Sequence, residues 1–432
     1  MSIKIMKQHY RLYIVFITLI LGMPVRGEAQ FLKKLFKRHK RHQDTTAVST
    51  IIKPVPVQTK KKSWPGYPPS HIKPEYRIDV LAPLYLDELP ENANATANVH
   101  ISEKASAGIE FYKGMKLAAD SLTSLHYHLD LHIHDITDTI KNIDFLVSIK
   151  EFENSDLLIG FLQPHDIPNI ARYAANNHIN FASAFSPSDA GVVNNPYFTL
   201  LQPTLQTHCE KIKELLLSNQ KGKKVILLHR NTSNLDETAY NYFTHDLKGI
   251  DVVNVVCDTN LNIKSVSSLF DSSQNNVVVV CVLDNTIAEK ILKRLNESFP
   301  AYRFEVYGMP SWKSISSLKK HDVYLNVKVI ITEPFYVNMS SKAARYIQKT
   351  YRKEFGGRPG EFVYRGYETL FWYANLLEKY GTIFNGKVSD VSSAQFSKFQ
   401  VKANFDKEHE VIFNENKHLF IYRYINGKLK VE

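Results

Sequence analysis

The sequence has few cysteines and, beyond its first thirty residues, no long apolar run. Three cysteines in 432 residues exclude a disulfide-rich scaffold, and the missing runs exclude a protein with several transmembrane helices. The motifs G-x-S-x-G, H-E-x-x-H, G-x-x-x-x-G-K-[ST] and G-x-G-x-x-G are also absent. The hydrophobic fraction of 44% is typical of globular proteins, and the length favours two lobes. These absences count against an enzyme without excluding one, and a hydrolytic or metal-dependent enzyme is the least favoured alternative.

The excess of positive charge is confined to the N-terminal part of the chain. The formal net charge is +11, of which residues 1–30 carry +3 and residues 31–74 carry +10, so residues 75–432 carry −2. A nucleic-acid-binding protein needs basic residues clustered on its folded part. The slightly acidic body therefore predicts no nucleic-acid partner.

Residues 1–29 predict a secretory signal peptide. Three basic residues precede an apolar run over 12–23, and small residues follow up to Ala29, after which we expect cleavage. An uncleaved anchor is the alternative, but the run is shorter than the roughly 18–20 apolar residues that span a bilayer. No cysteine lies near the cleavage region, so a lipid anchor is not expected. The prediction is a secreted, periplasmic protein.

Residues 30–74 predict a basic, extended tail rather than a domain. Segment 31–42 mixes four apolar with six Lys or Arg side chains, a pattern that suits a short amphipathic helix on an anionic surface. Segment 51–74 holds six of the eighteen prolines and predicts a linker. We expect residues 31–74 to contact peptidoglycan or anionic lipid, and a solubilising spacer is the equal alternative.

The body alternates short apolar runs with helical patterns. Strands are expected at 78–86, 126–134, 157–162, 179–185, 224–229, 252–257, 277–283, 303–307 and 327–332. Helices are expected after Ser106 and at 167–177, 207–218, 285–297, 341–355 and 367–380. Such alternation predicts parallel sheets with right-handed crossovers. A second series of the same kind begins after 198–203, so the fold class is α/β, with two doubly wound parallel-sheet lobes joined by a multi-stranded hinge.

Seven stretches, taken in order, resemble the type I periplasmic binding proteins, in particular the leucine/isoleucine/valine-binding branch. They are FYKGMKLAADSL (111–122), DLLIGFLQP (156–164), INFASAFSPSDAG (179–191), PYFTLLQPTLQTHCEKI (196–212), KKVILLHRNTS (223–233), KVIITEPFYV (328–337) and YIQKTYRKEFGGRPGEFVYRGYETLFWYANLLEKYG (346–381). The resemblance covers roughly residues 75–432.

The resemblance implies a hinged receptor that closes on a small solute, often an amino acid or peptide, and delivers it to a membrane transporter of the ABC type. We expect a small polar ligand, namely an amino acid, a peptide or a cell-wall fragment, that is bound for transport or sensing. It implies neither catalysis nor a cofactor. Because the family's chain crosses three times between its lobes, each lobe is discontinuous. We expect lobe I at 75–200 plus 333–395 and lobe II at 201–332 plus 396–432.

Ligand contacts are expected at the turns that follow strands, where two such sheets face each other. In lobe I these are Gln163 and His165 in GFLQPHD, and Ser186 and Ser188 in AFSPSDAG. A helix that begins at the two serines would direct hydroxyl and free N–H groups at an anion. A Ser/Pro cap without a ligand is the alternative.

Lobe II is expected to contribute the residues after its own strands, namely Thr232, Ser233, Ser311 and Trp312. The resemblance implies an acidic group that meets a ligand amine, and Asp284 is the first choice, with Glu333 in the hinge as the reserve. A helix N-cap or a surface charge is the alternative for both.

Three features depart from the family pattern or stand outside it. The polar stretch 85–103 is longer than the family's first loop and is expected to be a lid or a cover of the cleft. A strand would place four alternate histidines on one face, namely His126, His128, His132 and His134. We expect a polar sheet edge there, and a zinc or copper site is a minor alternative. Cys257 and Cys281 are expected to be buried thiols, with a disulfide as the alternative.

A second reading of the same scaffold belongs to a different class. The body would contact partner proteins of the cell envelope instead of a solute, while the basic tail holds it on the cell wall or on anionic lipid. The missing aromatic residue in CVLDNT, where the family usually presents one to its ligand, favours this reading over amino-acid binding.

Overall fold

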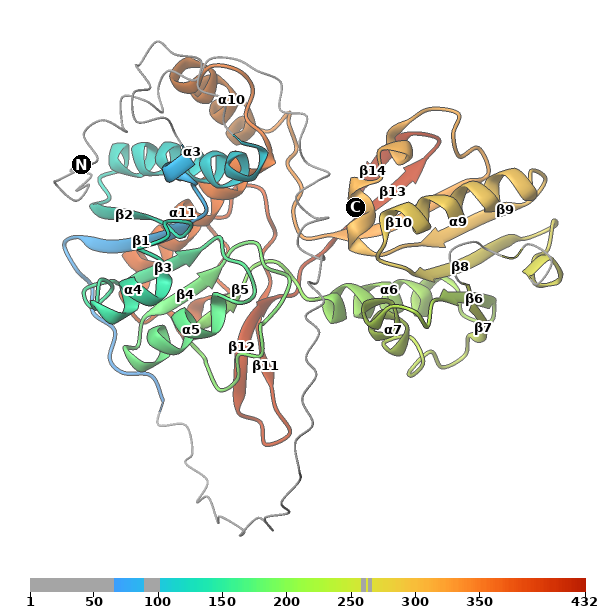
Figure 1. Cartoon of the computed structure of the whole chain (residues 1–432), viewed down its shortest axis with the longest axis horizontal. Helices are drawn as coiled ribbons and strands as arrows, with labels where there is room; N and C mark the ends of the chain where they lie inside the picture. The colour runs from blue at the N-terminus through green and yellow to red at the C-terminus, as the bar shows by residue number, and fades with distance from the viewer. Residues whose placement is uncertain (1–65, 89–101, 258–261, 263–265) are drawn as a thin grey trace, which may run out of the picture.

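A computed structural model describes residues 66–88, 102–257, 262 and 266–432. The chain forms two α/β lobes that lie side by side, each built on a seven-stranded sheet (Figure 1). The predicted fold class of two mostly parallel, doubly wound sheets is confirmed. The signal peptide, the tail up to residue 65 and most of the expected lid lie outside the described residues.

The first sheet is parallel except at one edge. From edge to edge its strands are β11 (Val401–Phe405), β12 (Val411–Asn416), β5 (Phe198–Leu200), β4 (Asn180–Ser183), β3 (Leu157–Gly160), β1 (Tyr76–Ala82) and β2 (Leu129–Asp135). Its helices are α3 (Glu103–Ser124), α4 (Ile143–Ser148), α5 (Ile167–Asn176), α10 (Lys342–Phe355) and α11 (Glu361–Tyr380). Two separate apolar cores, one with α3, α10 and α11 and one with α4 and α5, show that helices cover both faces.

The second sheet follows the same plan. Its strands in order are β14 (Lys428–Val431), β13 (Phe420–Ile425), β10 (Val327–Glu333), β9 (Arg303–Tyr307), β8 (Asn275–Cys281), β6 (Lys224–His229) and β7 (Asp251–Val256). Its helices are α6 (Leu205–Asn219), α7 (Asn234–Asn241) and α9 (Asn285–Ser298). The short 3-10 helices of the two lobes are η1 (Leu86–Glu88) and η5 (Asn385–Lys387), which follow β1 and α11, and η2 (Ser267–Leu269), η3 (Pro310–Ser314) and η4 (Ser316–Lys319) in the second lobe. The apolar strand β8 lies between parallel neighbours, as its sequence predicts.

The C-terminal strands are shared between the lobes. Residues 396–432 were expected to belong to lobe II, but β11 and β12 lie in the first sheet and only β13 and β14 lie in the second. The reason is pairing: β12 adds to β5 in parallel, while β13 adds to β10 in the antiparallel direction. The chain therefore crosses between the sheets at 201–204, after Glu333 and at 417–419.

Buried polar groups hold the crossings together. Glu415, at the end of β12, accepts hydrogen bonds from Thr204 N and Thr207 Oγ1 at 2.8 and 2.7 Å, and it pairs with Lys417. Burial alone would raise the pKa of Glu415, but Lys417 and the hydrogen bonds outweigh it and lower the pKa. His208 Nδ1 lies 2.7 Å from Thr332 Oγ1, and burial lowers the pKa of His208 to about 4, so its ring is neutral.

The end of the expected linker packs on the first lobe. The ring of Tyr67 meets that of Tyr197 edge to face, Ser70 Oγ donates to the carbonyl of Tyr380 at 2.6 Å, and Lys73 pairs with Asp156 at 2.7 Å. Residues 67–73 therefore belong to the folded body, and the tail ends before them.

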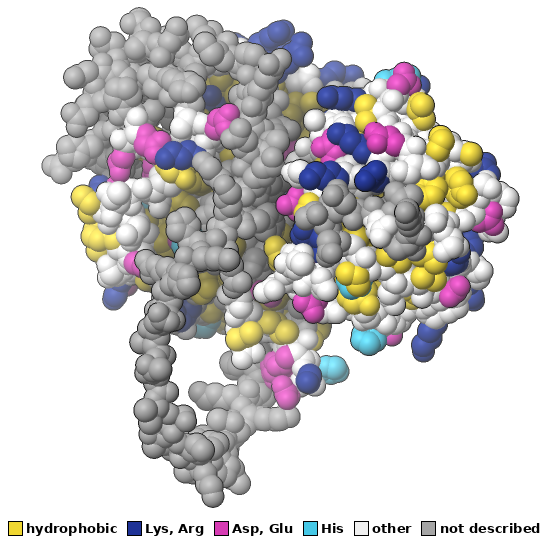
Figure 2. All heavy atoms as spheres, turned by 45° about the vertical axis from the view of Figure 1, so that its right-hand side comes forward, with side chains coloured by type: hydrophobic (Ala, Val, Ile, Leu, Met, Phe, Trp, Pro, Cys, Tyr) yellow, Lys and Arg dark blue, Asp and Glu magenta, His cyan; other side chains and the backbone are white. Residues whose placement is uncertain are grey.

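The described residues contain no helix that is long and apolar enough to cross a bilayer. Cys209, Cys257 and Cys281 are buried free thiols, so the 257–281 disulfide left open by the sequence is not formed. On the face shown in Figure 2, Lys and Arg side chains of the second lobe alternate with Asp and Glu, so no field of one sign covers it.

Glycines let α3 and α11 approach each other closely. A Cβ atom on Gly114 would lie 2.0 Å from the carbonyl oxygen of Val363, and one on Gly366 would lie 2.1 Å from that of Phe111. Because both obstacles are backbone atoms, neither helix can yield by turning a side chain. The first core depends on this contact.

We predict that Gly114→Ala lowers the free energy of unfolding by at least about 2 kcal/mol. Gly386→Ala is the matched control, because its Cβ would meet open space, and we expect it to change stability by less than about 0.5 kcal/mol. Urea unfolding followed by circular dichroism measures both, and equal midpoints would contradict the packing argument.

Candidate functional site

An aromatic cluster occupies the carboxyl edge of the first sheet. Phe161 directly follows β3 and Phe185 lies two residues beyond β4, and their ring centroids are 4.1 Å apart. Phe362, in the first turn of α11, and Phe111, on α3, each contact both rings at 5.0–5.7 Å. Phe111 and Phe161 are buried, whereas Phe185 and Phe362 are half-buried. This aromatic cluster lies where a doubly wound sheet places its ligands.

Arg365 covers the cluster from the next turn of α11. Its guanidinium lies 4.3 Å from the centroid of Phe185 and 5.4 Å from that of Phe335, which follows β10 in the second crossing. Its Nη2 donates to Gln202 Oε1, in the first crossing, at 2.5 Å. A guanidinium stacked on a ring can still offer its edge to a carboxylate. The site thus combines an apolar aromatic surface with a planar cation.

An ion network of Lys313, Glu333, Glu361 and Arg365 adjoins this face. Lys313 Nζ lies 2.7 Å from Glu361 Oε2 and 3.4 Å from Glu333 Oε2, and Glu361 lies 3.8 Å from Arg365. Burial raises the pKa of Glu333 to about 7 against the opposing effect of Lys313. Burial acts in the same direction on Glu361, but Lys313 and Arg365 outweigh it and lower the pKa of Glu361.

A small cavity lies beside the network. Its volume is about 10 Å³, roughly the space of one water molecule. Its walls come from the first and second crossings, from α11 and from the residues that follow β4 and precede β11. They are formed by Ala184, Leu201, Pro334, Phe335, Arg365, Glu368, Thr369, Ser397 and Phe399. Ligand pockets of binding proteins commonly measure about 300–1,000 Å³. A solute would therefore bind against the aromatic cluster from the space between the lobes and not inside this cavity.

The loop residues expected in lobe I are largely engaged with their own loops. Ser186 Oγ exchanges hydrogen bonds with Ser188 N and O at 3.2 Å, and Ser188 Oγ accepts from Ala190 N at 3.1 Å. No helix begins there: the described chain runs through residues 184–197 as turns into β5. The helix expected to begin at these serines is therefore wrong, and the serine hydroxyls stabilise a turn.

Gln163 and His165 follow Phe161 in the chain. Gln163 is half-buried, and its carbonyl accepts from Asp166 N at 3.0 Å. The side chain of His165 is 79% exposed and lies 3.4 Å from Asp166. Nothing in these contacts ties either residue to the ion network.

The residues expected in lobe II form caps and core contacts. Ser233 and Asp284 are the N-caps of α7 and α9, and Thr232 is exposed. Ser311 Oγ donates to the carbonyl of Leu283 at 2.8 Å. Trp312 is fully buried and donates from Nε1 to the carbonyl of Val282 at 2.7 Å. Trp312 therefore packs inside the second core and presents no ring to a ligand.

Glu333 is the one expected residue that joins the ion network. It ends β10, exposes only 8% of its side chain and faces Lys313. Reasoning from sequence missed Lys313, Glu361, Arg365 and the aromatic cluster. Phe161 and Phe185 were available as signals, since each lies at the end of a predicted strand, but both resemble ordinary core residues.

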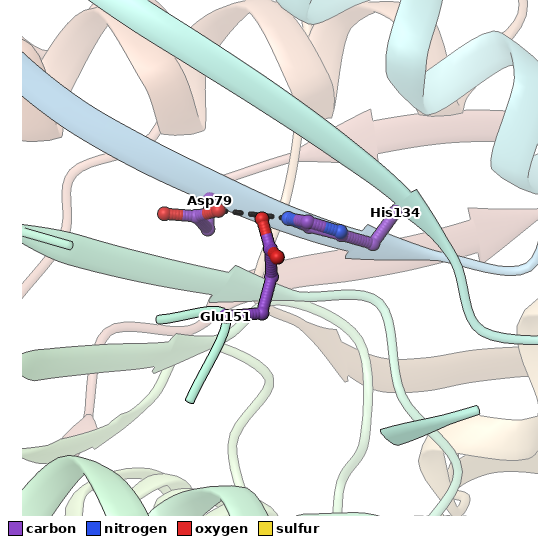
Figure 3. A group of neighbouring side chains, drawn as sticks. All are labelled: Asp79, His134 and Glu151. Carbon is purple, nitrogen blue, oxygen red and sulfur yellow. Dashed lines mark hydrogen bonds and ion pairs between the residues drawn. The ribbon is translucent and has the colours of Figure 1, made fainter. Parts of the chain in front are cut away.

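The histidine run does not converge on one point. β2 begins at Leu129, so His126 and His128 lie before the strand, and His132 pairs with Asp130 at 2.9 Å. His134 instead reaches Asp79, at 2.7 Å, and Glu151 lies beside both (Figure 3).

Asp79, His134 and Glu151 have the composition of a metal site but already surround a cation. Arg77 donates to Asp79 Oδ1 and Oδ2 at 3.0 and 2.9 Å and to Glu151 Oε1 at 3.1 Å. Burial opposes ionisation of Asp79, but His134 and Arg77 outweigh it and lower its pKa. The cluster is a buried ion-pair network that fixes β1 to β2, and the donors fit the guanidinium instead of a metal ion.

The two lobes, the three crossings and the aromatic and charged face between them define the class of hinged, two-lobed binding proteins. A model of the periplasmic binding protein family matches residues 148–399, more than half of the chain, and the chain belongs to this family. The resemblance inferred from the sequence motifs is therefore confirmed. No curated protein matches the chain in a sequence comparison.

Solved structures share the fold at low identity. A putative branched-chain amino acid ABC transporter protein from Rhodospirillum rubrum is 12% identical, with a TM-score of 0.59 over 83% of this chain and 99% of that one. An ABC transporter substrate-binding protein from Desulfitobacterium hafniense in complex with Leu is 13% identical, with a TM-score of 0.51 over 83% and 100%. Full-length LpoA from Haemophilus influenzae is 13% identical, with a TM-score of 0.53 over 85% and 60%.

We predict that the buried Glu333 makes stability fall as the pH rises. Its pKa of about 7 in the folded protein is above the ordinary Glu value, so its contribution is fully present at acidic pH and is lost as the pH passes 7. Glu333→Gln should remove about 1–3 kcal/mol of the fall in unfolding free energy between about pH 5 and about pH 8.

Chemical denaturation across this pH range measures the effect. Glu297→Gln, an exposed change on α9, is the control and should leave the wild-type pH dependence intact. A Glu333→Gln profile parallel to that of the wild type would contradict the assignment.

Proposed function

We propose that this protein is a non-catalytic receptor that acts outside the cytosol and binds a small solute between its two lobes. The observation that carries the proposal is the half-buried surface of Phe185 and Phe362 beside Arg365, at the carboxyl edge of the first sheet. Membership of the periplasmic binding protein family supports both the binding role and export. The predicted signal peptide at 1–29 supplies the route.

The site chemistry favours a solute with an apolar ring and an anionic group. Aromatic rings stack face to face or edge to face on a ligand ring, and the guanidinium of Arg365 beside these rings supplies a positive charge for a carboxylate. A zwitterionic aliphatic amino acid fits less well, because Ser186 and Ser188 are used in their own turn. The ligand class therefore differs from the polar solute that the sequence predicts, and delivery to a membrane transporter remains part of the proposal.

A second candidate function is an interaction protein of the cell envelope. The observation that favours it is that the cavity beside the crossings, with a volume of about 10 Å³, is too small for a solute. In this case the body binds partner proteins, and the basic tail holds it on peptidoglycan or anionic lipid. The tail available for attachment ends before Tyr67, because residues 67–73 pack on the first lobe.

We predict that aromatic carboxylates raise the thermal unfolding temperature by several degrees at saturating concentration, whereas leucine does not. Arg365→Met should abolish the shift, because it removes the cation and keeps a similar apolar bulk. Lys293→Met, on the outer surface of α9, is the control and should keep the shift. A leucine response would contradict the ligand class, and no response to any organic acid, amino acid or cell-wall fragment would contradict solute binding.

The second function predicts that the mature protein sediments with purified cell-wall sacculi or anionic vesicles and that deletion of residues 31–65 releases it. The deletion leaves the packed segment 67–73 in place, so folding of the body is preserved. Replacing the same stretch with a neutral linker of equal length controls for length. If the variant without residues 31–65 still sediments fully with sacculi or vesicles, attachment through the tail is contradicted.

A further inference from the structure

One ion pair joins the two lobes directly, beside the crossings. Lys313 belongs to η3 of the second lobe, and its Nζ donates to Glu361 Oε2 at 2.7 Å, in the first turn of α11 of the first lobe. The same ammonium lies 3.4 Å from Glu333 Oε2, where the chain leaves β10. A single side chain of the second lobe thus meets both the first lobe and a crossing.

The lysine is held rigidly by its own lobe. Its neighbours Ser311 and Trp312 donate to the carbonyls of Leu283 and Val282, which follow β8. The Trp312 ring packs so tightly on Gly308 that a Cβ there would lie 2.1 Å from a ring carbon. Because these contacts anchor η3, the backbone of Lys313 moves with the second lobe.

The carboxylates that face Lys313 are largely shielded from water. The side chains of Lys313, Glu361 and Glu333 are 25%, 27% and 8% exposed, so water screens their interaction much less than that of a surface pair. Glu361 also lies 3.8 Å from Arg365, which bonds Gln202 in the first crossing and stacks on Phe185. The pair is therefore continuous with both the hinge and the aromatic face.

We propose that Lys313 and Glu361 form a latch that holds the two lobes at one angle in the absence of a ligand. Separation of the lobes requires Lys313 to leave Glu361, and each of these partly buried groups then keeps only its weaker partner, Glu333 for the ammonium and Arg365 for the carboxylate. Glu333 keeps the ammonium at the hinge when the latch opens. This inference goes beyond the proposed function, because it requires no solute.

Distance measurement between the lobes tests the latch. Arg172→Cys on α5 and Lys290→Cys on α9 are exposed sites, one on each lobe, for nitroxide labels, and the native cysteines are buried. In the mature full-length protein we expect one narrow distance distribution by pulsed electron resonance. Lys313→Met should at least double its width or shift its centre, and Glu361→Gln should act in the same way.

The double variant Lys313→Met/Glu361→Gln should resemble either single variant, because both remove the same bond. Lys293→Met removes a surface pair with Glu289 on α9 and should leave the distribution unchanged. Circular dichroism establishes folding, and if Lys313→Met does not fold, Glu361→Gln decides, because it keeps the pairing of Lys313 with Glu333. A wild-type distribution in every folded latch variant would overturn the proposal.

All samples are free of ligand, so a failed solute screen leaves this result unaffected.

Discussion

Four ionisable groups buried around the crossings constrain the centre of this molecule. Lys313, Glu333, Glu361 and Arg365 have lost most of their water, and each depends on the others for compensation. They come from the second lobe, a crossing and the first lobe. Satisfying them fixes the position of α11 relative to η3, and with it the orientation of the two sheets near the hinge.

The same constraint shapes the surface that a ligand would meet. Because Glu361 and Arg365 lie on successive turns of α11, holding Glu361 at Lys313 places the Arg365 guanidinium over Phe185. The rings of the aromatic cluster then fill the space where polar loops would otherwise face a solute. The proposed binding surface thus differs in chemistry from a site made of hydroxyl groups, although the fold is that of the family.

Buried ionic groups recur throughout the body and have structural roles. Arg77 compensates the negative charges of Asp79 on β1 and of Glu151 after α4. Glu415 binds Thr204 in the first crossing and Lys417 in the third. Each cluster includes its own cation, so a group of acids and histidines here indicates an internal ion pair. Composition alone would assign the Asp79 cluster to a metal, and only the position of Arg77 shows otherwise.

The sequence by itself determined the fold class and most elements of the two parallel series, whereas α4, α7, β5 and the C-terminal strands β11–β14 were not predicted from it. The apolar runs predicted β6 and β9 with their observed bounds, and the family motifs predicted the two-lobed architecture. Both were possible because these patterns are local along the chain. Only the tertiary structure decided that β11 and β12 join the first sheet and that Lys313 meets Glu361 across the lobes. The physical reason is that strand pairing and ion pairing join distant residues, whose choice of partner depends on the packing of everything between them.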